Sequence, residues 1–234
     1  MLILRNDVQS SKLVFVSGLR CEAAIAGGPE ALAICGGAET LLRQLAAAAA
    51  FTRLTISFGI CGGLDPALRT GDVVVGTHVV ADGVSMMTDQ IVAQELAARL
   101  ASAGERVSLG VVAGVDAPVL TRLAKAELRR VTEASSVEME SQIAARFTAA
   151  RNAPFAVLRV VCDPAHRELP HLVTKAMKPD GGINVRAVAF GAMTSPAQTA
   201  SLITATRETA TAFATLRRCR RLPGLFQGLG LAHV

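Results

Sequence analysis

The sequence alternates short apolar runs with longer amphipathic stretches along most of its length. Apolar runs of this kind are typical of strands buried on both faces of a sheet, and amphipathic stretches are typical of the helices that cover such a sheet. We expect strands at residues 12–18, 52–59, 72–80, 106–114 and 155–161. Helices are expected at residues 40–50, 89–103, 119–132, 141–152, around 171–177, and at 196–218. The alternation predicts an α/β protein.

The length and regularity of the chain favour one domain. Its 234 residues suffice for a single large core, and they contain no internal repeat and no low-complexity linker. A hydrophobic fraction of 51%, with neither Trp nor Tyr, means that mainly aliphatic side chains on regular elements must form this core. We predict a single domain that spans residues 1–234.

The net charge of +5 does not indicate a nucleic-acid partner. Outside one cluster of basic residues, 20 basic side chains face 19 acidic ones; the cluster comprises Arg217, Arg218, Arg220 and Arg221. The rest of the chain is therefore nearly neutral, and side chains on which bases could stack are scarce. Because the helix dipole favours cations near a helix C-terminus, we interpret the cluster as a solvated helix end.

Cysteine use and hydropathy predict a cytoplasmic protein. The five cysteines are an odd number without a CxxC pair, which favours reduced thiols. No apolar run approaches the roughly 18 residues that span a bilayer, and Arg5 and Asp7 argue against a signal peptide. The apolar C-terminal segment, residues 222–234, is expected to pack on the body or at a subunit contact. Weak contact with a membrane surface is the alternative.

Four polar clusters are candidates for the functional site, because open α/β sheets bind ligands at the carboxyl ends of their strands. They lie at residues 18–22, 59–63, 137–141 and 159–163. The second cluster has neither the Gly-Lys-Ser/Thr of a P-loop nor the glycine spacing of a dinucleotide site. A tight turn is its simplest interpretation.

The carboxylates in these clusters have two interpretations each. Asp163 is either a general acid at a strand end or the cap of the next helix. Glu138 and Glu140 either lie near a helix start because its dipole favours them, or direct one carboxylate into a pocket. In the second case Met139, between them, would pack on a ligand.

Taken together and in this order, the clusters resemble the purine and uridine phosphorylase superfamily, especially its 5′-methylthioadenosine/S-adenosylhomocysteine nucleosidase branch. Residues 59–64 (Gly-Ile-Cys-Gly-Gly-Leu) are similar to the family's Gly-rich turn, and residues 69–75 to the strand after it. Val-Glu-Met-Glu-Ser at 137–141 resembles its most recognisable motif, and Arg-Val-Val-Cys-Asp at 159–163 resembles the segment with its catalytic aspartate. The resemblance covers residues 12–165 and implies a three-layer αβα sandwich with a mixed central sheet.

Residues 163–165 and 191–196 also resemble the hopanoid-associated phosphorylases, a branch linked to removal of adenine from adenosylhopane to give ribosylhopane. The resemblance implies a purine nucleoside as substrate, in particular an adenosine with a bulky 5′ substituent. It further implies a homo-oligomer that needs no metal and no cofactor. Phosphate is the one co-substrate that such a reaction could use.

The resemblance assigns catalytic roles to three residues and substrate contacts to seven. Asp163 would protonate purine N7 directly or through a relay, because the departing base gains negative charge. Glu22 would orient the attacking water, and Arg159 would steady that site. Glu140 would accept hydrogen bonds from the 2′ and 3′ hydroxyls and stabilise positive charge on the sugar. The other substrate contacts implied are Met139, Gly62, Gly63, Val119, Phe155 and Arg20.

Several positions depart from the family pattern. Ile60 stands where relatives usually have a hydroxyl residue near the nucleophile, Cys162 replaces a serine beside the acid, and Pro118 lies where many nucleosidases have an aromatic. Glu22 favours hydrolysis because phosphorylases typically carry arginine at this position. Phosphorolysis remains an alternative because Arg20 lies two residues away in the sequence. These departures leave one alternative, a nucleoside-binding or regulatory protein of the same fold without turnover.

Overall fold

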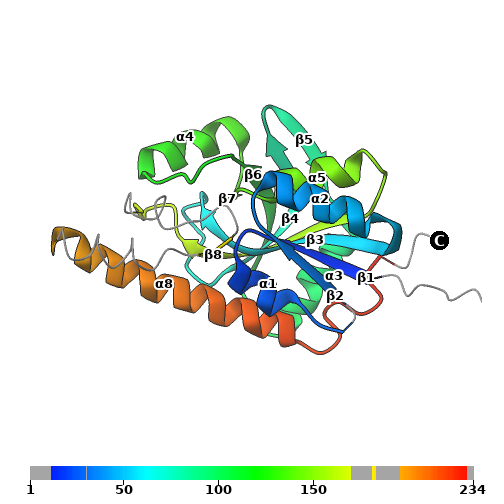
Figure 1. The fold of residues 1–234 in the computed structure, drawn as a ribbon. Helices are drawn as coiled ribbons and strands as arrows, with labels where there is room; N and C mark the ends of the chain where they lie inside the picture. Colours follow the sequence, from blue (N-terminus) through cyan, green and yellow to red (C-terminus); the bar gives the residue numbers. More distant parts are fainter. Residues whose placement is uncertain (1–11, 30, 170–180, 183–195, 231–234) are drawn as a thin grey trace, which may run out of the picture.

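The computed structural model describes residues 12–29, 31–169, 181–182 and 196–230. Its strands are β1 (Lys12–Ser17), β2 (Ala31–Cys35), β3 (Thr52–Gly63), β4 (Val73–Ala81), β5 (Val84–Met87), β6 (Val107–Gly114), β7 (Ser136–Glu138) and β8 (Phe155–Asp163). Over these residues they form one mixed sheet of eight strands in the order β2-β1-β3-β7-β6-β4-β5, with β8 pairing with both β3 and β4 (Figure 1).

Helices cover both faces of this sheet (Figure 1). They are α1 (Arg20–Ala26), α2 (Ala38–Ala48) with the 3-10 turn η1 (Ala49–Phe51), α3 (Gln90–Ser102), α4 (Arg122–Thr132), α5 (Ser141–Ala149) and α8 (Pro196–Arg221). Alternate side chains of each strand pack on opposite faces: Phe15 packs with the α3 and α8 side, and its neighbour Val14 with the α2 and α5 side. The predicted three-layer αβα sandwich with a mixed sheet is confirmed for the described residues.

Strand β8 connects the two halves of the sheet. It runs parallel to β3 and antiparallel to β4, and the pairings β4–β6, β6–β7 and β7–β3 close a ring of strands. All nine residues of β8 are buried. This strand therefore carries two charged side chains, Arg159 and Asp163, into the interior of the molecule.

Four short elements escaped the sequence prediction, namely α1, β2, β5 and β7. None exceeds seven residues, so none shows a readable period. The interpretation of residues 59–63 as a tight turn was wrong, because β3 continues to Gly63 and its last two glycines pair with β7. Helix α4 begins at Arg122 instead of 119, because the Thr121 hydroxyl caps it at the amide of Ala124 (3.2 Å). The helix expected around 171–177 lies outside the described residues.

The segment after α8 packs on the body, as predicted, over its described residues 222–230. Leu225, Phe226 and Leu229 are buried in the core, and the Phe226 ring meets the Phe15 ring edge-on at 5.1 Å between centroids. Arg99 of α3 holds the segment by donating to the carbonyl groups of residues 224, 225 and 227.

The basic cluster at the end of α8 makes specific contacts. Arg218 forms an ion pair with Glu105 at 2.8 Å. Arg220 is partly buried, donates to the carbonyl of Ala26 at 2.8 Å and packs over the Phe15 ring. The interpretation of this cluster as a solvated helix end was therefore wrong for Arg220. Within the part of the chain that the structure describes, no helix is long and apolar enough to cross a membrane.

Candidate active site

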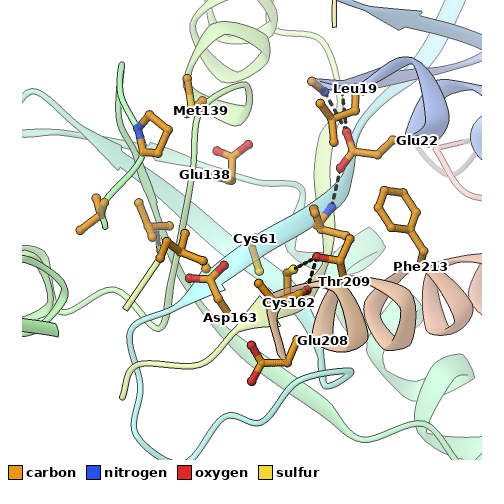
Figure 2. A pocket seen from close by; sticks show the side chains of 18 of the residues that line it. Leu19, Glu22, Cys61, Glu138, Met139, Cys162, Asp163, Glu208, Thr209 and Phe213 are labelled. Atoms are coloured by element: carbon orange, nitrogen blue, oxygen red, sulfur yellow. Dashed lines mark hydrogen bonds between the residues drawn. The ribbon is translucent and has the colours of Figure 1, made fainter. Parts of the chain in front are cut away.

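A pocket of about 640 Å³ lies where β1, β3, β7 and β8 end, a size within the range of roughly 300–1,000 Å³ that is typical of small-molecule sites. All four polar clusters singled out in the sequence contribute to its lining, as predicted. They supply Gly18, Leu19, Glu22, Ile60, Cys61, Gly62, Val137, Glu138, Met139, Glu140, Cys162 and Asp163. Figure 2 shows how Glu22 from α1, Glu138 from β7 and Asp163 from β8 approach the cavity from different elements.

The carboxylate of Glu22 lies in a cradle of backbone N–H groups. It accepts hydrogen bonds from the amides of Gly18 (3.1 Å), Leu19 (2.8 Å) and Ile60 (2.8 Å), and Figure 2 shows Glu22 beside Leu19. Such converging N–H groups form a site for an anion, and here a side chain of the protein fills it. Burial raises the pKa of Glu22, although the neighbouring Arg159 and the three N–H donors act against that shift.

Arg159 lies beneath the pocket and organises its acidic floor. Its guanidinium is 1% exposed, pairs with Glu138 at 2.5 Å and approaches Glu140 at 3.4 Å. Glu138 also accepts hydrogen bonds from the amides of Glu140 and Ser141, which start α5. Glu138 therefore satisfies the helix start, as one of the two interpretations of the motif expects. Glu140 lines the pocket, as the other expects.

The acid–base equilibrium of Glu140 is strongly perturbed. Its burial, together with the negative charges of Glu138 and Glu22, raises its pKa to about 8, although Arg159 acts in the opposite direction. A carboxyl group in this state can carry a proton at neutral pH when the pocket is empty. Hydroxyl groups of a bound sugar would offer it hydrogen bonds that favour the charged form.

Two glycines make room for this charged cluster. A Cβ atom at Gly59 would lie 2.5 Å from a Glu22 carboxylate oxygen and 2.7 Å from Nη1 of Arg159. A Cβ atom at Gly18 would collide with the Glu140 carboxylate. The first position is inside β3, so its glycine serves close packing of side chains against the backbone and not a turn.

Asp163 forms a buried ion pair that the sequence did not reveal. Its Oδ2 lies 2.5 Å from Nζ of Lys125, which projects from α4 and is 1% exposed. Burial raises the pKa of Asp163, and Lys125 opposes the shift. Since Asp163 pairs with this lysine and lines the pocket, its position supports the general-acid interpretation. The helix that the capping interpretation requires falls outside the described residues.

Apolar side chains form much of the remaining wall. Met139 borders the acidic floor, and Val119 and Pro118 come from the loop before α4. Val119 therefore lies where the sequence placed it. Helix α8 adds a side that the sequence analysis missed, comprising Ala205, Thr206, Glu208, Thr209, Ala210 and Phe213. Cys162 contacts the Thr209 hydroxyl at 3.3 Å (Figure 2).

Three predicted contact residues are not brought into the pocket. Phe155 begins β8 and lies eight positions before Asp163, or roughly 26 Å along the strand. It packs in the core beside α5 residues, so its proposed role in base recognition was wrong. Arg20 is exposed on α1 and does not line the cavity. Gly63 lies one residue past Gly62, against the backbone of Pro164, and is not part of the lining.

The missed residues carried little sequence signal. Lys125 is a single lysine in an amphipathic helix, where lysines usually face water. The residues of α8 that line the pocket have an ordinary helical composition. Among the described residues, no group of three His, Cys, Asp or Glu side chains is arranged to hold a metal ion.

The sequence was compared with the patterns of protein families and with curated proteins. The sequence pattern of the phosphorylase superfamily matches residues 20–193. A search of curated proteins finds no match.

Solved structures with a similar fold include nucleosidases and a futalosine hydrolase. The 5′-methylthioadenosine/S-adenosylhomocysteine nucleosidase of Campylobacter jejuni superposes with a TM-score of 0.61 at 14% identity, covering 91% of this chain and 100% of that one. A mutant of the Helicobacter pylori nucleosidase, with 5′-methylthioadenosine in its active site, gives 0.62 at 16% identity, covering 90% and 98%. Futalosine hydrolase of Helicobacter pylori gives 0.59 at 17% identity, covering 66% and 88%.

Proposed function

The chain belongs to the phosphorylase superfamily, and we propose that it is a nucleosidase that hydrolyses the N-ribosyl bond of a purine nucleoside and releases the free base. Its fold is shared with nucleosidases, one of them solved with 5′-methylthioadenosine in its active site. Those neighbours are other proteins, and the choice of reaction for this chain rests on its own pocket.

The position of Glu22 is the observation that favours water over phosphate as the nucleophile. Its carboxylate fills the cradle formed by the amides of Gly18, Leu19 and Ile60, so these N–H groups are not available to hold a phosphate ion. Arg159 is engaged with Glu138 and Glu140, and Arg20 does not line the pocket. A buried carboxylate with a raised pKa is suited to orient a water molecule and accept its proton.

The other acidic groups match the remaining steps of the reaction. Asp163 lies across the pocket, where it can pass a proton to N7 of the departing base. Glu140 would accept hydrogen bonds from the ribose hydroxyls, and its charged form would stabilise the positive charge that develops on the sugar. Met139 would pack against the same ring.

We also propose an adenosine with an apolar 5′ substituent as the substrate, and adenosylhopane is the candidate that the family resemblance suggests. The supporting observation is the apolar wall of the pocket, to which Leu19, Leu169 and Phe213 contribute. Such a wall favours removal of an apolar group from water at about 25 cal/mol per Å².

Base and sugar analysis tests the proposal. The protein is incubated with 5′-methylthioadenosine, and separately with a 5′-alkyl-substituted adenosine, each with and without phosphate, and the sugar product is identified by mass spectrometry. We expect adenine and a free ribosyl product at the same rate with or without phosphate. Phosphate-dependent formation of a ribose 1-phosphate would contradict the hydrolytic proposal.

The Asp163→Asn variant separates an enzyme from a binding protein of the same fold. An enzyme should lose about 10²-fold or more in turnover, because general acid catalysis typically contributes 10²–10⁴-fold. Its nucleoside affinity, measured by calorimetry, should change little. A wild-type protein that binds these nucleosides but releases no base would instead support the regulatory alternative.

A further inference from the structure

Lys125 is a buried cation on the Asp163 side of the pocket, and every proton of its ammonium has an acceptor. Nζ lies 2.5 Å from Oδ2 of Asp163, 3.0 Å from the carbonyl oxygen of Pro164 and 3.1 Å from that of Arg167. The backbone carbonyl of Asp163 is 3.4 Å away. The lysine side chain is 1% exposed, so water does not share these contacts.

A structural role alone does not account for this arrangement. Burying a lysine is unfavourable, and an apolar side chain of similar volume often replaces a buried ion pair without loss of stability. This lysine reaches the carboxylate from α4, the helix at the upper left of Figure 1. The charge is placed where the proposed reaction needs a proton.

We propose that Lys125 is a positioning residue that stores the proton which Asp163 delivers to the leaving base; this inference rests on the proposed nucleosidase function. In the free enzyme the proton resides on the ammonium and Asp163 is a carboxylate. The lysine also fixes the direction of that carboxylate by holding the loop of residues 163–167.

The proton balance of the reaction closes with this assignment. As the C1′–N9 bond breaks, its electron pair goes to the purine, and N7 takes a proton through Asp163 from the Lys125 ammonium. The oxygen of water forms the new bond to C1′, and its proton goes to Glu22. Lys125 is then a neutral amine and Glu22 a neutral acid, and exchange with solvent returns one proton from Glu22 to Lys125.

The test compares two leaving groups on the same sugar in Lys125→Met and Lys125→Gln variants. One substrate is the purine nucleoside that the wild-type protein cleaves best, and the other is the p-nitrophenyl β-ribofuranoside with the same 5′ group. The p-nitrophenolate leaves without protonation, so its release does not need the stored proton. At pH 8 we expect kcat for the purine to fall about 10²-fold and kcat for p-nitrophenol release to stay within about threefold.

The pH profile adds a second readout. Without the ammonium, the desolvated carboxyl of Asp163 takes its proton from solvent at acidic pH, so the loss in purine cleavage should shrink as pH falls. In an Asp163→Asn background, Lys125→Met should cause no further loss, because the two residues act through one proton. The Gln variant retains donors for the carbonyl groups and guards against misfolding of the Met variant.

Arg129→Met is the matched control, since it removes a partly exposed ion pair with Asp65 from the same helix and should alter neither activity. The inference would be overturned if kcat fell equally for both leaving groups in folded Lys125 variants. It would also be overturned if kcat for purine cleavage stayed unchanged in these variants. Failure of the proposed function is seen separately, as a wild-type protein that releases no base from any nucleoside, and it removes the inference as well.

Discussion

The Gly59→Ala variant tests whether kcat depends on the exact position of the Glu22 carboxylate and not only on the stability of the fold. The new Cβ atom would lie 2.5 Å from the nearer Glu22 oxygen, whereas ordinary contacts begin at 3.4 Å. The carboxylate must therefore withdraw by about 0.9 Å, which lengthens its hydrogen bond to the Ile60 amide from 2.8 Å to at most about 3.7 Å. Arg159, 2.7 Å from the same Cβ position, must shift too.

Two quantities follow from this displacement. Overpacking a buried position typically costs about 1–3 kcal/mol of the free energy of unfolding. Misplacing a catalytic group by about 1 Å can cost about 10²-fold in rate, and we expect that loss in kcat for base release. Denaturant unfolding measures the first quantity, and steady-state assay of adenine release measures the second.

Gly76→Ala is the control for this experiment. Its Cβ atom would lie 2.8 Å from Cβ of Val157 in the core, away from the pocket lining. It should destabilise the fold by a similar amount and leave kcat unchanged below the unfolding temperature. A Gly59→Ala enzyme with wild-type kcat would refute the requirement for a fixed Glu22, and equal rate losses in both variants would trace the effect to general destabilisation.

Two further predictions concern stability. Phe226→Ala should lower the free energy of unfolding by about 3–5 kcal/mol, because its buried ring fills the core beside Phe15; a loss below about 1 kcal/mol in urea unfolding would show that the C-terminal segment contributes little. The pKa of Glu140 is raised to about 8 from an ordinary 4.5, so the folded state binds this proton more tightly than the unfolded state does. The stabilisation that results, measured as free energy of unfolding, is complete below pH 4.5 and is lost as pH rises towards 8. Unfolding of the Glu140→Gln variant should therefore vary less steeply with pH over that interval, and an identical slope would contradict the assignment.

The long elements and the four clusters were readable from the sequence because they follow rules of local pattern. Strand β8 is visible as an apolar run, and the strand-end rule then puts Asp163 in the site. The Val-Glu-Met-Glu-Ser motif was recognised as functional and Glu140 was assigned to the substrate, but the ion pair between Glu138 and Arg159 was not predicted. That pair depends on the direction of each side chain from a short strand.

Contacts between distant segments were beyond the sequence. Lys125 and Asp163 are 38 positions apart, and nothing in α4 marks one lysine as buried. Phe155 was misplaced because a strand has two ends, and an aromatic near a motif in sequence can lie at the far end in space. The homo-oligomeric state, the membrane-surface contact and the cytoplasmic location stay predictions.

The α8 residues that line the pocket are synthesised late, after the other parts of the site. The Glu22 cradle and the Asp163–Lys125 pair need only residues up to 169, but the wall that includes Thr209 and Phe213 is translated after them. Until α8 and the segment through 230 arrive, the sheet face that carries Phe15 and Phe58 has α3 on it but lacks the rest of its cover. A nascent chain at that stage contains the residues of the cradle and of the ion pair, but it exposes apolar surface of the kind that makes partly folded chains prone to aggregation.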